Sequence, residues 1–386
     1  MHQRGFVYAM ALGFVVFITI LSASILMQGM LQESLSQRSG NQGESLHLAD
    51  GGVDQALINL RTTDPSDDVM TRTMAGGTFT VLSVVPVVPG TQRVTVRGTA
   101  GGETRDVEAI ITQVPQSVFQ FALFGSQQIN VSGNASTDSY DSRSGAYSDA
   151  TAGHDGDIGT NTTTPGGVTI GGSIFVDGQV AVGPNVADPT SVVTGYNPAF
   201  ITGTPTVVSQ SDVFPMPVVN PANDGVNIQT QCPDQTVNGQ TTVTLTSTGG
   251  INGTNVYCFH DLKINGGGVF TASGPVKIYL TGALKASGNS SIGADSDPTR
   301  MAFLLNSSSG ATLEEGTITG STLFYGAVYG PGSTINISGN AKVFGSIVGK
   351  TISVTGNAEI HYDEAMTTVT NVSNLYRTAV VSWRDL

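Results

Sequence analysis

The longest apolar run of the chain lies at its N-terminus. From Phe6 to Gln32 there is no charged residue, and this exceeds the ~20 residues that a helix needs to cross a bilayer. The apolar region of a cleavable secretory signal is shorter, about 7–15 residues. Arg4 precedes the run and Glu33 follows it. We therefore expect a single membrane-spanning segment with its short N-terminus in the cytoplasm.

Helical spacing of apolar residues continues beyond this run. The recurring positions are Leu31, Leu35, Leu46, Ala49, Val53, Leu57 and Leu60. Steps of three and four residues predict one helix over 6–60, after a short basic leader at 1–5. Gly40, Gly43, Gly51 and Gly52 weaken this helix locally, each by up to ~1 kcal/mol relative to alanine.

A period of two replaces the helical period after this segment. Alternating apolar residues centre on Val81, Val96 and Ala109, and Gly101-Gly102 separates the second and third groups. This pattern predicts three strands with a tight hairpin turn at the two glycines. We expect a small antiparallel β module over 61–114.

Very short apolar groups and glycine turns fill the chain from about Pro115 onward. A Ser/Thr-Gly-Asn element begins at Ser132, Ser287, Ser338 and Thr355, and the last two begin 17 residues apart. The spacing of 51 between Ser287 and Ser338 is three times this period. The repeats predict a parallel β-helix (solenoid) over 115–366, with about a dozen rungs at ~4.8 Å.

Within each rung of this expected β-helix, alternate side chains face inward and outward. Ile335 and Ile337 should point into the interior, while Asn340 and Asn357 should stack at one corner and bond along the axis. Residues 367–386 are expected to form a C-terminal capping segment. The predicted fold class is therefore mainly β with one N-terminal transmembrane helix, and a sandwich or jelly roll is the alternative for the large domain.

Composition and charge narrow the classes of partner. Charged residues make up 12% of the chain, the net charge is −13, and Lys plus Arg number 16. A nucleic-acid partner is not expected, because phosphates require clustered basic residues. The two cysteines, Cys232 and Cys258, lie in the part expected outside the cytoplasm, where an oxidising compartment permits a disulfide. Two free buried thiols are the alternative.

The N-terminal motifs resemble a known family. Arg4-Gly5 before the apolar helix, Leu31-Gln32-Glu33, and the run from Ala49 to Leu57 are similar to type IV pilus assembly proteins of the PilX N-terminal family. The resemblance implies cleavage between Gly5 and Phe6 by a prepilin-type peptidase. It also implies an inner-membrane location with the C-terminal part periplasmic or extracellular, or in a pilus. Met10 stands where major pilins carry glutamate, which is a departure also found among minor pilins; an uncleaved signal anchor is the alternative.

Motifs in the remainder resemble a domain of unknown function that is often fused to such N-termini. They are 138–142, 156–161, 273–276, 324–329, 360–366 and the terminal 382–385. The last rungs are also similar, more weakly, to bactofilins, which are β-helical and polymer-forming.

Catalytic motifs are missing from the sequence. It contains no HExxH, no GxSxG and no P-loop. His361 with Asp363 and Glu364 is the nearest approach to a site, but a polar end of the last rung is the favoured interpretation of this group. Asp155 and Asp157 are weak calcium candidates in an acidic stretch that an ordinary solvated loop also explains. No cofactor and no resident metal are expected.

These patterns favour a non-enzymatic, minor-pilin-like protein that displays a structural or adhesive β-helix outside the membrane. Expected partners are membrane lipid, other pilins or pilus assembly proteins, a prepilin peptidase and surface carbohydrate. One alternative is a signal-anchored envelope protein outside any filament. Another is a carbohydrate-active β-helix enzyme, because such enzymes use paired carboxylates.

Overall fold

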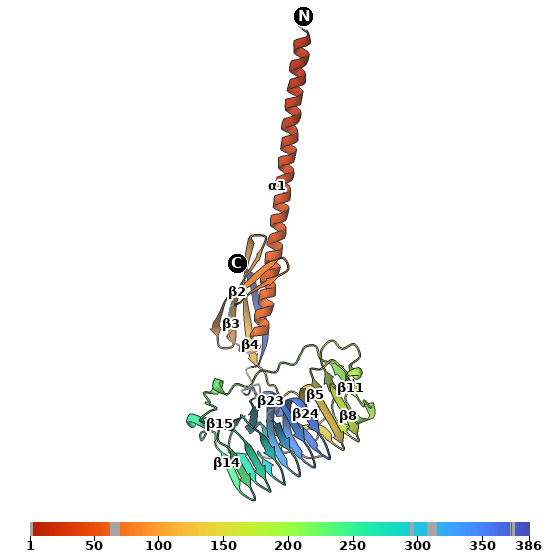
Figure 1. Cartoon of the computed structure of the whole chain (residues 1–386), viewed down its shortest axis with the longest axis vertical. Helices are drawn as coiled ribbons and strands as arrows, with labels where there is room; N and C mark the ends of the chain where they lie inside the picture. Colours follow the sequence, from red (N-terminus) through yellow and green to blue (C-terminus); the bar gives the residue numbers. More distant parts are fainter. Residues whose placement is uncertain (1–2, 62–69, 294–296, 307–314, 371, 373–374) are drawn as a thin grey trace. The chain divides into compact units, whose positions relative to one another are not determined.

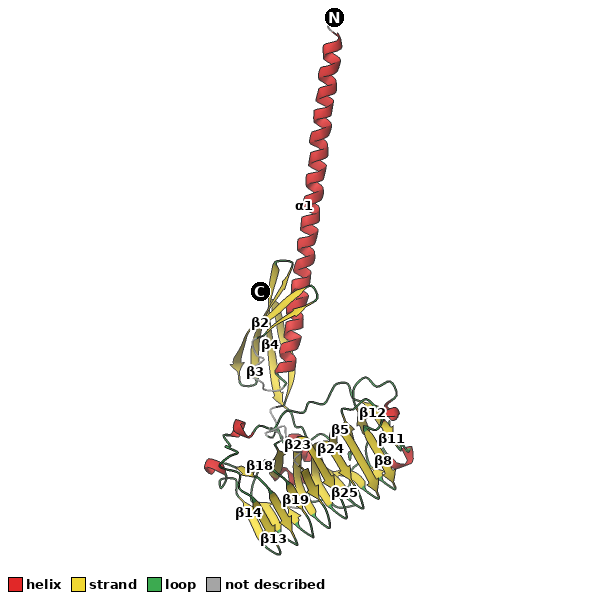
Figure 2. Cartoon of the chain, viewed as in Figure 1, coloured by secondary structure: helices red, strands yellow, loops and turns green. Residues whose placement is uncertain are grey.

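The computed structural model describes residues 3–61, 70–293, 297–306, 315–370, 372 and 375–386. The chain forms two compact units. Unit 1 contains Met1–Val114 together with Tyr376–Leu386, and unit 2 contains Pro115–Leu375. The fold is mainly β, with one long helix at the N-terminus (Figures 1 and 2).

Unit 1 is built on the helix α1 (Gln3–Asn59), which runs without a break through all four of its central glycines. An N-terminal helix is therefore present as expected, but it begins at Gln3, within the segment expected as a leader, and ends at Asn59. Its C-terminal part buries Leu48, Ala49, Val53 and Ala56 against a sheet. This packing offsets the poor helix propensity of glycine, since burial of an apolar face contributes more than propensity.

The sheet of unit 1 has five strands in the order β1-β2-β3-β4-β26. The pairs β1–β2, β2–β3 and β3–β4 are all antiparallel. The alternating pattern predicted three of these strands. Gly101 and Gly102 both have positive φ in the β3–β4 turn. The bounds are β1 (Thr71–Met74), β2 (Gly77–Val88), β3 (Thr91–Ala100), β4 (Glu103–Pro115) and β26 (Tyr376–Asp385).

The C-terminal segment differs from the expected cap over 367–386. Residues Tyr376–Asp385 form β26, which lies along β4 in the sheet of unit 1. Leu386 N donates to Asp106 O, and Trp383 Nε1 donates to Asp50 Oδ1 of α1. The chain terminus thus contributes the fifth strand of this sheet instead of a cap on unit 2.

Two glycines allow α1 and the sheet to approach closely. A Cβ at Gly98 of β3 would collide with the backbone of Ser45 and Ala49 in α1. A Cβ at Gly52 would meet the side chains of Val96 and Phe79. The glycine that weakens the helix is thus required at its contact with the sheet.

Unit 2 consists of short strands that pair in parallel and form three sheets, which β5, β23 and β24 connect. Sheet A contains β13 (Gln235–Asn238), β16 (Leu262–Asn265), β19 (Leu284–Ala286), β22 (Glu315–Ile318), the last parts of β23 (Leu323–Ile337), β24 (Lys342–Val354) and β5 (Leu123–Gly133), then β8 (Val168–Gly172) and β11 (Val193–Thr194).

Sheet B contains β14 (Thr242–Leu245), β17 (Val269–Ala272), β20 (Ser291–Ile292), the first parts of β23 and β24, then β25 (Glu359–Asp363), β6 (Ser136–Tyr140) and β9 (Phe175–Val176). Sheet C contains β15 (Val256–Phe259), β18 (Val276–Leu280), β21 (Met301–Leu305), the middle of β23 and β24, the start of β5, then β7 (Ile158–Thr160), β10 (Val180–Val182) and β12 (Val207–Ser209).

Short 3₁₀ helices interrupt the connections between these strands. They are η2 (Ser142–Ser144), η3 (Pro189–Val192), η4 (Pro198–Phe200), η5 (Pro221–Asp224), η6 (Ile251–Gly253), η7 (Pro298–Arg300) and η8 (Glu364–Thr368).

The stacking order of unit 2 does not follow the sequence. The first strands, β5 and β6, lie in the middle of the stack and pair with the last strands, β24 and β25. The chain builds outward from β5 to β12, crosses to the opposite end, and returns level by level from β13 to β25 (Figure 1). The described part of each sheet has eight or nine strand segments, fewer than the dozen rungs expected.

The crossing segment, residues 210–234, runs along sheet C. Phe214 packs on Phe124 with ring centroids 4.6 Å apart, and Pro217 O accepts a hydrogen bond from Tyr329. Asp224 Oδ2 lies 2.7 Å from Lys277 Nζ. A segment without sheet pairing thus covers one face of the stack by side-chain contacts.

A column of glycines marks the corner between sheets A and B. Each has positive φ and contacts the glycine of the neighbouring level; in stacking order they are Gly239, Gly266, Gly288, Gly320, Gly339, Gly356, Gly133 and Gly172. All four Ser/Thr-Gly-Asn glycines belong to this column, as expected. Gly288 and Gly339 are two levels apart, through Gly320, so the expected three levels of 17 residues are wrong there.

The asparagines beside this column bond along the stack. Asn134 Nδ2 donates to Asn357 Oδ1 at 3.0 Å, and Asn357 Nδ2 donates to Asn340 Oδ1 at 3.1 Å. Ile335 and Ile337 are fully buried inside the stack. Both predictions for these positions are confirmed.

Candidate functional site

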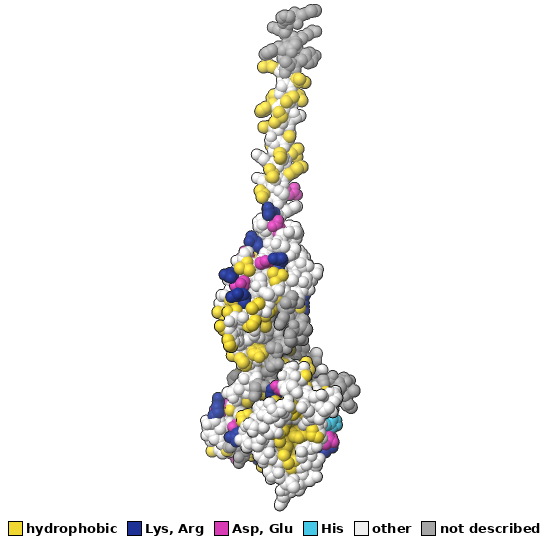
Figure 3. Space-filling view, turned by 90° about the vertical axis from the view of Figure 1, so that its left-hand side faces the viewer, with side chains coloured by type: hydrophobic (Ala, Val, Ile, Leu, Met, Phe, Trp, Pro, Cys, Tyr) yellow, Lys and Arg dark blue, Asp and Glu magenta, His cyan; other side chains and the backbone are white. Residues whose placement is uncertain are grey.

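The first candidate is the apolar N-terminal part of α1. Among the described residues it is the one helix long and apolar enough to cross a membrane, with a mean hydropathy of 2.1 and none of that window buried. Met10, Phe17 and Leu26 are each more than 60% exposed, and Figure 3 shows hydrophobic side chains along this part of the helix. Such a surface requires lipid or another apolar surface to cover it.

The processing residues of the sequence analysis, Gly5 and Phe6, both lie inside α1 near its N-terminus. Cleavage between them stays a prediction. Met10 follows in the same helix.

The second candidate is a polar and aromatic column on sheet B. Tyr325, Phe344, His361 and Asp138 occupy the same register on β23, β24, β25 and β6. The Tyr325 and Phe344 rings stack with centroids 4.4 Å apart, and the Phe344 and His361 rings stack at 4.8 Å. Parallel, in-register strands bring like positions together at each level, which places these rings face to face.

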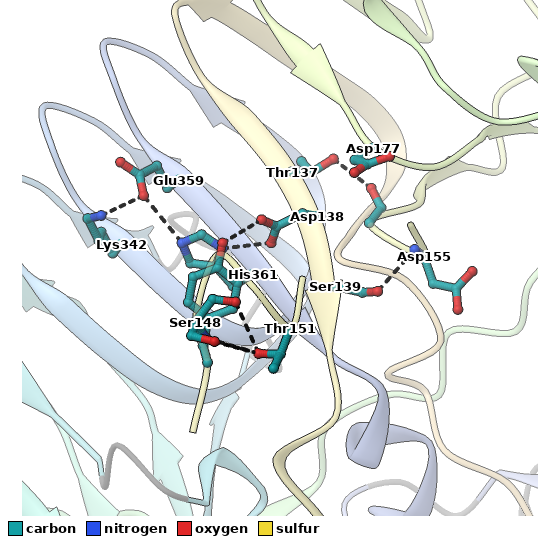
Figure 4. Close-up of polar contacts among 12 residues, drawn as sticks. Thr137, Asp138, Ser139, Ser148, Thr151, Asp155, Asp177, Lys342, Glu359 and His361 are labelled. Atoms are coloured by element: carbon teal, nitrogen blue, oxygen red, sulfur yellow. Dashed lines mark hydrogen bonds and ion pairs between the residues drawn. The ribbon is translucent and has the colours of Figure 1, made fainter. Parts of the chain in front are cut away.

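His361 lies between two carboxylates. Its Nδ1 is 2.6 Å from Asp138 Oδ1, and its Nε2 is 3.3 Å from Glu359 Oε2, within ion-pair distance but without hydrogen-bond geometry (Figure 4). Lys342 Nζ is 2.6 Å from the same Glu359 oxygen. The side chain of His361 is only 4% exposed.

The ring of Tyr147, from the loop between η2 and β7, lies with its centroid 3.9 Å from that of His361 and 5.6 Å from that of Phe344. Its hydroxyl donates to Asp138 Oδ2 at 2.7 Å. Burial, together with that hydrogen bond and the nearby charge of Asp138, raises the pKa of Tyr147. A histidine with a carboxylate partner has the composition of a general base, but this side chain is buried, and its contacts with Tyr147 and Asp138 hold the loop against the strands.

Asp363 and Glu364, which the sequence groups with His361, have separate partners. Asp363 Oδ1 accepts from the backbone N–H groups of Ser142 and Ala365, capping η8 and holding η2. Burial raises the pKa of the Asp363 carboxyl, and its Oδ2 is buried without a hydrogen-bond partner. Glu364 Oε1 accepts from Ser139 Oγ.

Beside these helices lies a small polar pocket of about 260 Å³. Its lining comes from η2, η7 and η8 and consists of Ser142, Arg143, Asp297, Thr299, Arg300, Ala365 and Thr368. Arg143 is paired with Asp141 and Arg300 with Asp297. Both guanidinium groups are thus engaged by neighbouring carboxylates.

The two weak calcium candidates take part in hydrogen bonds through different groups, Asp157 through its carboxylate and Asp155 through its backbone N–H. Asp157 Oδ1 accepts from Gln179 N at 2.6 Å, and burial raises the pKa of Asp157. Asp155 N donates to Ser139 Oγ at 3.0 Å (Figure 4). In the described part of the chain the group with metal-ligand proximity is a different one: Asp234, His260 and Asp261, whose ligand atoms lie within 4.8 Å of one another. Lys263 Nζ lies 2.9 Å from Asp261 Oδ2, which reduces the charge available to a cation.

Cys232 and Cys258 form a disulfide bond with a Cα–Cα distance of 4.6 Å. Cys258 is on β15, and Cys232 is near the end of the crossing segment. The bond fastens that segment to β15 of sheet C, at the end of the stack that β13 and β14 form.

Comparison with known proteins identifies one family model over part of the chain and solved structures of low sequence identity. The family model "Domain of unknown function (DUF7305)" matches residues 235–369, which run from β13 to η8 and make up less than half of the chain. No curated protein matches. Eight solved chains match, among them the competence-associated pilin ComZ from Thermus thermophilus, at 13% identity. That alignment covers 90% of this chain and 97% of ComZ, with a TM-score of 0.29, a value too low to support an argument.

Proposed function

We propose that this chain is a membrane-anchored, minor-pilin-like structural component of a type IV pilus or related surface assembly. The observation that carries the proposal is the division of α1 into two parts. One unbroken helix is apolar and fully exposed in its N-terminal part, and it packs on an antiparallel sheet in its C-terminal part. An exposed apolar half-helix can lie in lipid or pack among the helices of other pilins.

The N-terminal motifs support the same proposal, because they resemble PilX-type pilus assembly proteins. In this proposal a prepilin peptidase cleaves the Gly5-Phe6 bond, and the mature helix leaves the inner membrane for a filament. Both units after the helix lie on the periplasmic or extracellular side. The chain then presents unit 2 at a surface, where carbohydrate is one class of adhesive partner.

Unit 2 is, in this proposal, a parallel β-helix that serves as the structural or adhesive body. Three parallel sheets with one corner column of glycines support that assignment. The buried side chain of His361 and the paired arginines of the pocket support a role without catalysis. If instead unit 2 is a carbohydrate-active enzyme, purified protein should cleave acidic polysaccharide, and changing Asp155 and Asp157 should abolish the activity.

The deciding experiment is mass spectrometry of the N-terminus of protein from sheared filaments and from membranes. A first residue of Phe6 supports pilin-type processing, and an intact Met1 supports the signal-anchored envelope protein. Gly5→Val should block cleavage, whereas Gly13→Val, inside the helix, should leave the cleavage site intact. Intact Met1 in both fractions of the unaltered protein would contradict the proposal.

A further inference from the structure

The level formed by β13 and β14 ends the stack of unit 2. The pairing of β13 is with β16, and that of β14 is with β17. In Figure 1 no described strand lies beyond β14. We call residues Gln235–Leu245 the β13–β14 edge.

The backbone of this edge has hydrogen-bonding groups that point away from the stack. Thr241 O accepts from Val269 N, and Leu245 O accepts from Ser273 N. In a parallel pair alternate residues bond to opposite sides, so Thr242 and Thr244 direct their N–H and C=O groups outward. Gln235 N donates to Asp261 O, and Thr236 is outward by the same alternation. An edge of this kind is a template for another strand.

Charge, which usually protects such an edge, is missing from it. No charged residue occurs from Gln235 to Phe259. Thr236 is in register with Lys263, which is in register with Lys285, so within this sheet the strands carry charge only from the second level inward; Asp234 directly precedes β13. Proteins commonly blunt edges with lysine or proline, and neither occurs in Gln235–Leu245. Although the chain carries a net charge of −13, two such edges can approach without repulsion between their strands.

The corner of the edge also continues the ladder of the stack. Asn265 Nδ2 donates to Asn238 Oδ1 at 3.2 Å, and Asn238 is exposed. Gly239 has the positive φ of the glycine column, with open space around a Cβ. The opposite end is different, because Gly195 beyond β11 lies against Ile170 O instead of Gly172. The two ends of the stack therefore differ in backbone geometry at this corner. The partner that best complements the β13–β14 edge is the same edge of another copy.

We propose that the β13–β14 edge docks with the same edge of a second copy of this chain. A two-fold axis relates the copies, so their edge strands run antiparallel, and threonine and valine side chains meet across the interface. This homophilic contact would join two displayed copies, whether or not the chain enters a filament.

The test is sedimentation of the full-length protein in a neutral detergent, comparing the unaltered chain with Thr244→Pro and Thr244→Val. Proline removes an outward N–H and leaves the bonds to β17 in place. Valine keeps the N–H and the β-branched shape. We expect the unaltered chain and Thr244→Val to sediment as dimers, and Thr244→Pro to show a halved protein mass.

A folding control accompanies this comparison. The melting temperature and the Cys232–Cys258 bond of Thr244→Pro should match those of Thr244→Val. Should the proline variant melt early, Thr242→Asp with Thr244→Asp decides the question, because it places four carboxylates at the interface and leaves the backbone intact. A monomeric unaltered chain, or a dimer that persists in both edge variants, would overturn the proposal.

Discussion

His361 illustrates how unit 2 joins residues that are distant in sequence. Its partner Asp138 lies 223 positions earlier, and the ring that covers it, Tyr147, comes from the loop after β6. Three ionisable groups, from Asp138, Glu359 and Lys342, surround one imidazole that has almost no access to water. At this position charge and stacking together fix the loop.

Replacing His361 with alanine should destabilise unit 2 by about 2–5 kcal/mol, since it removes a buried ring that packs against Phe344 and Tyr147. Chemical denaturation followed by circular dichroism measures the change. His154→Ala is the matched control, because His154 also pairs with an aspartate but its side chain is 82% exposed, and exposed pairs contribute little. Equal losses in the two variants would contradict a structural role for the His361 cluster.

Asp363 should give unit 2 a dependence on pH that its amide removes. Burial, and less strongly the charge of Asp141, raise the pKa of Asp363 in the folded state. The folded state then binds the proton more tightly than the unfolded state, so stability is present at low pH and is lost as pH rises through the folded pKa. Asp363→Asn keeps an acceptor for Ser142 and Ala365 without the charge.

The melting temperature of Asp363→Asn should therefore equal that of the unaltered chain near about pH 3 and exceed it increasingly toward about pH 7, above the ordinary carboxyl range. Thermal scans across this range measure the difference. Asp212→Asn, at an exposed position, is the control for the loss of one carboxylate. A gap that closes as pH rises would contradict the assignment of a raised pKa.

At the residue scale the sequence was informative where one position repeats. The Ser/Thr-Gly-Asn elements identified the glycine corner and the asparagine contacts, because the same turn chemistry recurs at each level. It was not informative for Asp138 with His361 or for Asp234 with His260. Those pairs depend on which strands become neighbours, and no local pattern near Asp138 points to a residue 223 positions away.

At the scale of elements, the periodicity of apolar residues predicted which helices and strands are present better than it predicted the number of residues between successive levels. Helix α1 and strands β2 to β4 follow from their apolar periods. The 17-residue period holds between Gly339 and Gly356, but loops of different length lie between other levels, as between Gly288 and Gly320. A stack of parallel strand levels tolerates such insertions in the loops between its strands, so multiples of one period cannot count the levels.

The disulfide should matter most for the crossing segment and the last level of the stack. Changing Cys232 and Cys258 together to serine should destabilise unit 2 by roughly 3 kcal/mol, as expected for releasing a loop of this length. Hydrogen exchange should accelerate first in β13, β14 and β15, beside the bond. Reductant should reproduce the effect in the unaltered chain and have none on the double variant. Faster exchange confined to β24 and β25 would contradict this assignment.

At the scale of the whole molecule, the order of levels could not be predicted. The repeat pattern is the same whether the chain stacks sequentially or begins in the middle, because every level has the same corner. The crossing segment 210–234 carries no strand period and was therefore not recognised as the connection between the two ends. The pairing of β5 with β24 also makes the first and last strands of unit 2 neighbours, so the central level forms only after most of the unit has been synthesised.

Anchoring of the whole molecule rests on the exposed part of α1. Ile18 lies in the centre of the uncharged run and is 44% exposed. Ile18→Lys places a charge where insertion costs about 3 kcal/mol, so the fraction of protein that resists extraction with alkaline carbonate should fall sharply. Ser34→Lys, one residue beyond Glu33 and outside the run, should leave that fraction unchanged. Both variants add one lysine to the same helix, so a difference between them requires that the centre of the run lies in the membrane. Equal extraction of the two variants would show that lipid does not hold α1. Extraction of the unaltered chain without detergent would show the same.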